Sequence, residues 1–311
     1  MMKKSTISSV QGAPMYICID IGGTAIKHGL ASASGTLLQQ GSTPTHAHEG
    51  GGPGIIRTVR RLIRQYIETK QENDQIAGIA LSTAGMVDPV KGSIFYALPA
   101  SIPDYTGTEW KKMLEAEFHL PCAVENDVNC AALGELWRGA GRGCSSAFMM
   151  TIGTSIGGCA VYDGHIIHGS GCSAGEIAYM RVPGGRLHEL ASATRLVHDV
   201  AAAKGVEPKT LNGYKVFALA AAGDTDARQA IATLSGHIAD AIGNVITVMQ
   251  PEVVILGGGI MAQESVFRPL IEQNVSRQLP PAMYEHTRIA FATLGNDAGM
   301  IGALCHLLQT Q

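Results

Sequence analysis

The sequence lacks an excess of either charge: 23 Lys and Arg residues stand against 26 Asp and Glu residues, for a net charge of −3. This near-balance gives no electrostatic reason to expect nucleic acid or a membrane surface as a partner. Charged residues make up only 16% of the chain and hydrophobic residues 46%. That composition excludes disorder for most of the chain and supplies enough apolar residues for one large or two moderate domains.

Paired cysteines are also missing. The seven cysteines are an odd number and include no C-x-x-C pair, which disfavours a disulfide framework and favours reduced thiols in the cytoplasm. Residues 1–14 have no apolar run, so we expect a flexible tail rather than a signal peptide. The uncharged stretch Cys144–Tyr162 is interrupted by Gly, Ser and Thr, which predicts a strand and a loop rather than a membrane span.

Two common nucleotide motifs are missing as well. The P-loop pattern G-x-x-x-x-G-K-[ST] does not occur, which argues against a P-loop NTPase. Gly257-x-Gly259-x-x-Ala262 loosely matches a dinucleotide fingerprint, but no acidic residue stands about 20 residues further on, as a Rossmann site requires.

Glycine, by contrast, is abundant: 38 residues, or about 12% of the chain against roughly 7% on average. Three glycine-rich turns follow apolar segments, at Asp20–Thr24, Gly153–Gly158 and Gly257–Gly259. Backbone without side chains lets N–H groups approach an anion closely, so the set indicates phosphate binding, although each turn alone could be an ordinary connection. The other glycines, including Gly50–Gly52 and Gly184–Gly185, are interpreted as turns.

An internal repeat sets the predicted fold. The segments Met15–Thr24 and Met150–Gly158 each carry an apolar strand into a Gly/Thr turn, and each continues as a β-meander. Buried strands and amphipathic helices follow both, so we expect two α/β domains. Helices are predicted at 54–70, 108–118, 126–137, 189–203, 214–222 and 225–249 and from 298, and further strands at 76–81, 122–124, 253–256 and 288–292. The arginines of 54–70 are interpreted as a solvated face.

As a set, the motifs resemble the ROK family of bacterial sugar kinases and sugar-responsive repressors. They are Asp20-Ile-Gly-Gly-Thr24, Glu125-Asn-Asp127, Gly153-Thr154, Ala174-Gly-Glu-Ile177, Gly257-Gly-Gly259 and Leu294-Gly-Asn-Asp-Ala-Gly299. The resemblance implies the duplicated actin-like ATPase fold (RNase H-like) of hexokinases. It also implies a small domain at 15–120, completed by the helix 298–311, and a larger domain at 121–297.

The resemblance further implies an ATP-dependent and Mg²⁺-dependent kinase that phosphorylates a hydroxyl, expected to be the 6-hydroxyl, of a hexose or β-glucoside. Asp127 would be the general base; the alternative is a helix cap, since Asn126 and Asp127 open a helix. Asp20 would help to hold Mg²⁺ through water, and its alternative is a turn-forming Asp. The residues implied for the nucleotide are Gly22, Gly23, Thr24, Lys27, Gly153, Thr154, Gly258, Gly259 and Asn296, with Lys27 alternatively a solvated lysine.

For the sugar, the resemblance implies Gly85, Asn126, Asp127 and Glu176. Tyr179 stands where the family usually has a His, and the cysteines of the family's zinc segment are missing between Arg181 and Leu187. The sequence therefore resembles the zinc-free branch, which includes β-glucoside kinases and glucokinases, and no structural zinc is expected.

Other departures concern the sugar and phosphate contacts. His188 falls where the family commonly has a sugar-binding Glu, and Glu189 follows it. Either Glu189 takes over the contact or the sugar site is altered; the alternative is that both residues only cap the helix that starts near 189. Ser155 and Cys159 replace glycines near the phosphate loop. These changes leave a sugar-binding pseudokinase as an alternative function.

The family also contains transcriptional repressors, which carry a helix-turn-helix segment ahead of the first glycine loop. Before Asp20 we expect only a short tail and one strand, so the kinase is the favoured function and a sugar-binding regulator the alternative. The family resemblance implies a homodimer. The cysteines favour the cytoplasm, and from the charge balance we expect no nucleic acid or membrane partner. The identity of the sugar stays open.

Overall fold

The computed structural model describes residues 12–71 and 75–311, so most of the expected tail, residues 1–11, lies outside the described residues. The chain forms two compact units. Unit 1 contains the described residues up to Cys130 together with Gly299–Gln311, and unit 2 contains Ala131–Ala298. The division falls inside helix α3 (Asp127–Arg138), whereas the sequence predicts a boundary after residue 120. The predicted domain limits stay a prediction.

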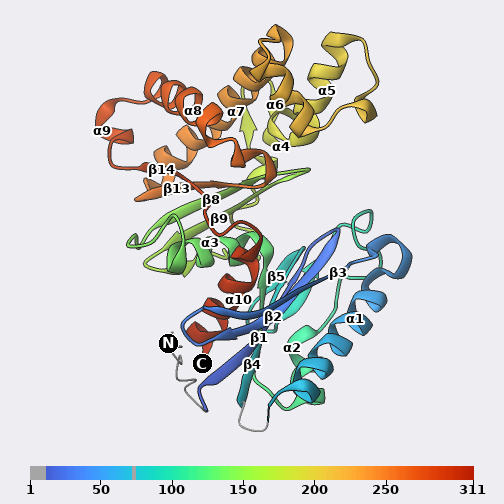
Figure 1. Ribbon diagram of the computed structural model, residues 1–311. Helices are drawn as coiled ribbons and strands as arrows, with labels where there is room; N and C mark the ends of the chain where they lie inside the picture. Colours follow the sequence, from blue (N-terminus) through green and yellow to red (C-terminus); the bar gives the residue numbers. More distant parts are fainter. Residues whose placement is uncertain (1–11, 72–74) are drawn as a thin grey trace, which may run out of the picture. The chain divides into compact units, whose positions relative to one another are not determined.

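Unit 1 is built on a five-stranded sheet in the order β3-β2-β1-β4-β7. Its strands are β1 (Pro14–Ile21), β2 (Ala25–Ser32), β3 (Leu37–Pro44), β4 (Gln75–Thr83) and β7 (Cys122–Asn126). The first three form an antiparallel meander, and β1, β4 and β7 run parallel. Helices α1 (Ala47–Thr69) and α2 (Trp110–Phe118) lie on one face of the sheet and α10 (Ala298–Thr310) on the other (Figure 1).

Unit 2 repeats this plan with the order β10-β9-β8-β13-β14. Its strands are β8 (Ala147–Ile152), β9 (Ile156–Tyr162), β10 (His165–Ile166), β13 (Val253–Gly257) and β14 (Arg288–Phe291). Here too the first three strands form an antiparallel meander and β8, β13 and β14 run parallel. Matching strand order and direction in the two sheets confirm the repeat and the mixed α/β fold.

Helices pack against the sheet of unit 2 (Figure 1), and helices and sheet together form one large apolar core. They are α4 (Leu187–Ala191), α5 (Ala193–Lys204), α6 (Gly213–Ala221), α7 (Thr225–Met249), α8 (Glu264–Gln278) and α9 (Pro281–Tyr284). Among the described residues, α7 is the one helix long and apolar enough to cross a membrane. Its buried residues, including Ile238 and Ile242, belong to the core, which accounts for that composition.

Several elements were not predicted from the sequence. They include the hairpins β5 (Met86–Asp88) with β6 (Ser93–Tyr96) and β11 (Arg181–Val182) with β12 (Gly185–Arg186), and helix α8. Helix α8 contains Pro269 and buries only Phe267, Ile271 and Val275, so its apolar periodicity is weak. The predicted helix 189–203 is two helices, which separate at Ser192, whose hydroxyl accepts the N–H of Arg195 and caps α5.

The interpretation of Gly50–Gly52 as a turn is wrong. These glycines lie inside α1, where Gly51 kinks the helix with φ of 53°. The N–H of Gly52 donates to the carbonyl of Pro103 at 2.7 Å. A Cβ atom on Gly52 would lie 2.3 Å from the carbonyl oxygen of Asp104, so only glycine lets the two backbones come this close.

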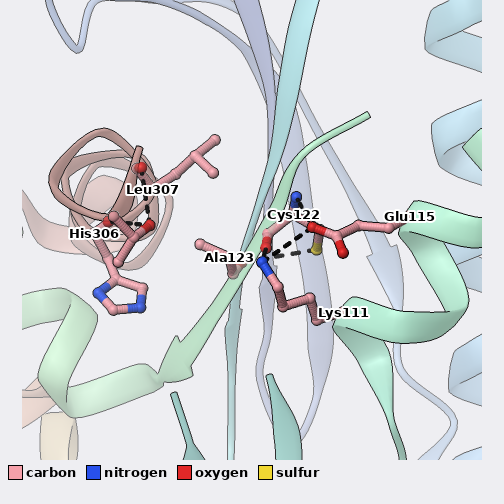
Figure 2. Close-up of polar contacts among 7 residues, drawn as sticks. Lys111, Glu115, Cys122, Ala123, His306 and Leu307 are labelled. Atoms are coloured by element: carbon pink, nitrogen blue, oxygen red, sulfur yellow. Dashed lines mark hydrogen bonds and ion pairs between the residues drawn. The ribbon is translucent and has the colours of Figure 1, made fainter. Parts of the chain in front are cut away.

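Two charged side chains of α2 cover the end of the edge strand β7. Lys111 donates to the carbonyl of Cys122 at 2.9 Å, and Glu115 accepts the N–H of Cys122 at 3.0 Å (Figure 2). The same two side chains form an ion pair of 3.0 Å. Charged groups at an edge strand oppose pairing with a strand of another sheet. Lys111 and Glu115 therefore protect the unpaired edge of β7.

Candidate active site

Strand register brings the first candidate residues of unit 1 into one row across the sheet. Asp20 on β1 lies opposite Lys27 on β2 and opposite Ser82 on β4, and Ser82 lies opposite Glu125 on β7. The carboxylate of Asp20 accepts the Ser82 hydroxyl at 2.6 Å and lies 3.3 Å from the Lys27 ammonium. Asp20 is thus a buried, hydrogen-bonded carboxylate rather than a solvated turn residue, and Lys27 has a partner.

The start of helix α10 lies against the same carboxylate. A Cβ atom on Gly299 would lie 2.5 Å from Cγ of Asp20, so the family-like Gly at this position makes room for the acid. A carboxylate is favoured near a helix N-terminus because the helix dipole is positive there. The adjoining turn Gly22–Thr24 is held by Thr45, whose hydroxyl donates to the Gly22 carbonyl at 2.7 Å.

The next row across the sheet carries the candidate sugar residues. Thr83 on β4 lies opposite Asn126 on β7. The side-chain amide of Asn126 donates to the carbonyl of Gly85 at 2.9 Å, and Gly85 has a φ of 104°. The structure therefore joins Gly85 and Asn126, two residues that the sequence places 41 positions apart.

Asn126 is also the cap of helix α3. Its side-chain oxygen accepts the N–H groups of Val128 and Asn129, at 2.8 and 3.1 Å. Asp127 accepts the Val128 N–H through Oδ1 at 2.9 Å. The buried carboxylate of Glu125, which no sequence pattern marks as a support, accepts the backbone N–H of Asn126 at 2.7 Å. Capping thus belongs mainly to Asn126, and it fixes where Asp127 stands.

In unit 2, the glycine turns after β8 and β13 meet. Gly258 has a φ of 95°, and a Cβ atom there would lie 2.3 Å from the carbonyl oxygen of Ile152. The carbonyl of Gly153 accepts the N–H of Ala193 at 2.8 Å, at the start of α5. Thr154 and Ser155 remain exposed beyond this anchored glycine. Gly157 and Gly158, by contrast, lie within β9, and Gly158 packs against the backbone of Gly175.

A cavity of about 740 Å³ opens beside this turn. Gly153, Thr154 and Gly259 form one end of it, and α5 and α6 supply apolar walls that include Val197 and Phe217. Gly258 and Asn296 do not line it; with Gly259 they line a smaller cavity of about 360 Å³. No sequence motif marks the walls of the larger cavity, because these walls come from helices that are also amphipathic for core packing.

Two departures from the family pattern contact each other. The hydroxyl of Ser155 lies 3.2 Å from Nδ1 of His188, which stands on α4. Helix α4 begins at Leu187 rather than near 189, and Glu189 accepts the N–H of Arg186 at 3.3 Å. Glu189 therefore caps α4, whereas His188 contacts Ser155 in the glycine-rich segment Gly153–Gly158.

Glu176 lies half-buried in unit 2, just before the short helix η1 (Ile177–Tyr179). Burial raises the pKa of its carboxyl group, because the charged form loses hydration. Tyr179, at the position of the family His, is 64% exposed, and Cys159 is fully buried in β9. Cys159 therefore places no side chain on the exposed surface of the phosphate loop.

No group of three His, Cys, Asp or Glu side chains lies close enough together to hold a metal ion among residues 12–71 and 75–311. The expectation of no zinc stays a prediction. Asp20 fits water-mediated Mg²⁺, because both of its oxygens already have partners in Ser82 and Lys27 and Mg²⁺ keeps several of its waters.

Comparison with known proteins identifies the family. The model of the ROK family matches residues 16–310. The chain belongs to the ROK family. It is 31% identical over 310 residues to a glucokinase of Halalkalibacterium halodurans, a match that covers 92% of this chain and 93% of the relative. It is also 31% identical over 300 residues to a β-glucoside kinase of Listeria innocua, covering 94% and 97% of the two chains.

Solved structures agree with the sequence comparison. The ROK hexokinase of Thermus thermophilus superposes with a TM-score of 0.81 at 27% identity, covering 95% of this chain and 98% of that one. The actin-like ATPase fold and the enzyme class expected from the sequence, a carbohydrate kinase, are confirmed by these relatives.

Proposed function

We propose that this ROK kinase transfers the γ-phosphoryl group of ATP to the 6-hydroxyl of a hexose or a β-glucoside. The observation that supports it most is the Gly85–Asn126–Asp127 cluster of unit 1, in which a carboxylate is fixed by the cap of α3 beside a glycine carbonyl. Such a carboxylate can accept a proton from a sugar hydroxyl, while the polar groups around it can bind neighbouring hydroxyls.

The proposed chemistry is an in-line transfer. The hydroxyl oxygen of the sugar bonds to the γ-phosphorus as the bond between that phosphorus and the β,γ-bridging oxygen breaks, and ADP leaves with the electron pair. The hydroxyl proton passes to the carboxylate of Asp127. Catalysis then depends on positioning and on charge stabilisation of the phosphoryl group.

The nucleotide has two sets of candidate contacts. In unit 2 the hydroxyl of Thr154 offers a donor to phosphate oxygens beside Gly153, whose own N–H already donates to the Ser155 carbonyl at 2.9 Å, and the cavity of about 740 Å³ has a size suited to adenosine. In unit 1 the turn Gly22–Thr24 offers the N–H groups of Gly23 and Thr24 beside Asp20, since the Gly22 N–H already donates to the Ala25 carbonyl at 3.0 Å. Lys27 and Asp20 would respectively supply charge to the phosphates and hold the waters of Mg²⁺, which neutralises the developing charge when bound.

The candidate sugar residues are Gly85, Asn126 and Asp127 in unit 1, and separately Glu176, His188 and Glu189 in unit 2. Glu189 accepts a backbone N–H through one carboxylate oxygen and His188 contacts Ser155 through Nδ1, so each keeps a second polar atom for a sugar hydroxyl. An imidazole can donate or accept a hydrogen bond, unlike a carboxylate, and its use here would change which sugar substituents are accepted.

The test is an ATP-consumption screen of the purified protein with Mg²⁺ against hexoses, amino sugars and β-glucosides. Sugar-dependent ADP formation, with the product identified by NMR as a 6-phosphate, would support the proposal. A sugar-dependent thermal shift without ADP formation would instead indicate a pseudokinase, and DNA binding in a gel shift would indicate a regulator. Size-exclusion chromatography tests the expected homodimer.

A further inference from the structure

Beneath the Gly85–Asn126 contact lies a buried polar network that the proposed reaction does not itself use. Tyr105, Trp110 and Thr83 are each at most 1% exposed, yet all three carry a polar side-chain group. The indole N–H of Trp110 donates to the Tyr105 hydroxyl at 3.0 Å, and that hydroxyl lies 2.6 Å from Oγ1 of Thr83. Thr83 in turn donates to the carbonyl of Ala84 at 3.2 Å.

The direction of this network is fixed by the chemistry of its members. An indole N–H can only donate, so the Tyr105 oxygen accepts from Trp110 and its single proton is left to donate to Thr83. The Thr83 proton is then the one that reaches the Ala84 carbonyl. Every donor has an acceptor in this arrangement alone, and reversing the Tyr105–Thr83 bond would leave a buried hydroxyl proton unused.

The network ends at the Ala84–Gly85 loop, which the side chain of Asn126 also contacts. Ala84 precedes Gly85, whose carbonyl accepts the amide of Asn126, and Thr83 is the strand partner of Asn126. The N–H of Ala84 donates to the carbonyl of Ile21 at 3.2 Å, which ties the same loop to the end of β1. The position of Asn126, and with it Asp127, thus depends on how the Ala84–Gly85 loop is held.

Tyr105 is itself held by the glycines of α1. The kink at Gly51 lets the Gly52 N–H reach the carbonyl of Pro103, directly before Asp104 and Tyr105. Asp104 has a φ of 54°, in the left-handed region that non-glycine residues seldom adopt. The hydrogen bond from Gly52 to Pro103 helps to hold the chain in this conformation. The glycine run that resembled a turn in the sequence therefore supports the segment that places Tyr105.

We propose that Tyr105 is a positioning residue for the sugar site, which acts through Thr83 on the Ala84–Gly85 loop and so on Asn126 and Asp127. This inference rests on the proposed sugar kinase function. Tyr105 would touch neither sugar nor ATP. Loss of its hydroxyl group would impair sugar binding and turnover but not nucleotide binding. Loss of a residue that merely stabilises the core would not separate these two effects.

The experiment compares Tyr105→Phe with Tyr66→Phe. Tyr66 is the control, because its hydroxyl also hydrogen-bonds a side chain of unit 1, Nδ1 of His28 on strand β2 at 2.8 Å, but is not part of the network of Tyr105, Trp110 and Thr83. For Tyr105→Phe we expect kcat/KM for the sugar to fall about tenfold, equal to about 1.4 kcal/mol, with the KM for ATP unchanged. Tyr66→Phe should change neither. Equal sugar kinetics in both variants, whatever their Tm values, would overturn the proposal.

Thr83 provides the rescue and the coupling test. Thr83→Ser keeps the hydroxyl and should retain sugar kinetics, whereas Thr83→Val should behave like Tyr105→Phe. The double variant should be no worse than either single one, because both remove the same connection. Additive losses would contradict the network.

A crystal structure of Tyr105→Phe separates this inference from the proposed function. Loss of the Asn126–Gly85 hydrogen bond would support the positioning role even if the wild-type protein phosphorylated no sugar in the screen. An unchanged Ala84–Gly85 loop would overturn it, even in an active kinase.

Discussion

The carboxylate of Glu135 accepts the backbone N–H of Leu294 at 2.8 Å, deep in unit 2. The same side chain accepts the N–H groups of Thr293 and Ala140, at 2.9 and 2.7 Å. Three backbone donors thus converge on one fully buried acid. They fix the segment that leads into the Gly295–Asp297 turn, which carries the candidate nucleotide residue Asn296.

Glu135→Gln should destabilise the protein by about 3 kcal/mol, because an NH₂ group would face N–H donors and the charge-assisted hydrogen bonds would be lost. Urea unfolding measures the loss. The matched control is Glu252→Gln, since Glu252 also accepts two backbone N–H groups, from Ser145 and Ser146, but is exposed. A loss at Glu135 no larger than that at Glu252 would contradict the importance of burial.

Asp127→Asn should reduce turnover by at least about 100-fold, since an amide cannot accept the proton of the sugar hydroxyl. Folding should be preserved, because the amide oxygen can still accept the Val128 N–H. Steady-state kinetics and thermal unfolding measure the two effects. Asp163→Asn, in the turn after β9 where Asn is well tolerated, is the control. An active Asp127→Asn enzyme would remove Asp127 as the base.

Gly258→Ala should cost at least about 2 kcal/mol of stability, because Gly258 has a left-handed φ and a Cβ would press on the Ile152 carbonyl. Gly236→Ala is the control: this residue of α7 has no heavy atom within 4 Å of a Cβ, so the exchange should raise helix stability slightly. Denaturant midpoints that shift equally in both variants would disprove the close approach.

Glu176 should make stability depend on pH. Burial raises its pKa in the folded state above the unfolded value of about 4.3. The folded state then binds the proton more tightly, so the contribution is complete below the unfolded pKa and is lost as pH rises through the folded pKa. Relative to Glu176→Gln, the wild type should therefore lose stability with rising pH from about 4 upward. Parallel unfolding free energies for the two proteins across that range would refute the shift.

Much of the site was readable from local patterns. Asp20, the Glu125–Asp127 triplet and the glycine turns are short motifs whose members are adjacent in the chain. The supports of these motifs were not readable: Ser82, Glu135 and Tyr105 are ordinary residues of strands, helices and loops until strand register and packing bring them to their partners. For the same reason, the sequence could not show that Asn296, a candidate nucleotide residue, does not line the larger cavity.

The class of the molecule can be read from the sequence. Apolar periodicity, the repeated meander and the glycine turns indicate a two-part α/β chain, because these features depend on neighbours along the chain. Which side chains share a hydrogen bond, as with Asn126 and Gly85, Ser155 and His188, or Tyr105 and Thr83, depends on the folded chain. Such contacts join residues distant in sequence, and sheet register and helix packing select them from many pairs that the sequence alone leaves equivalent.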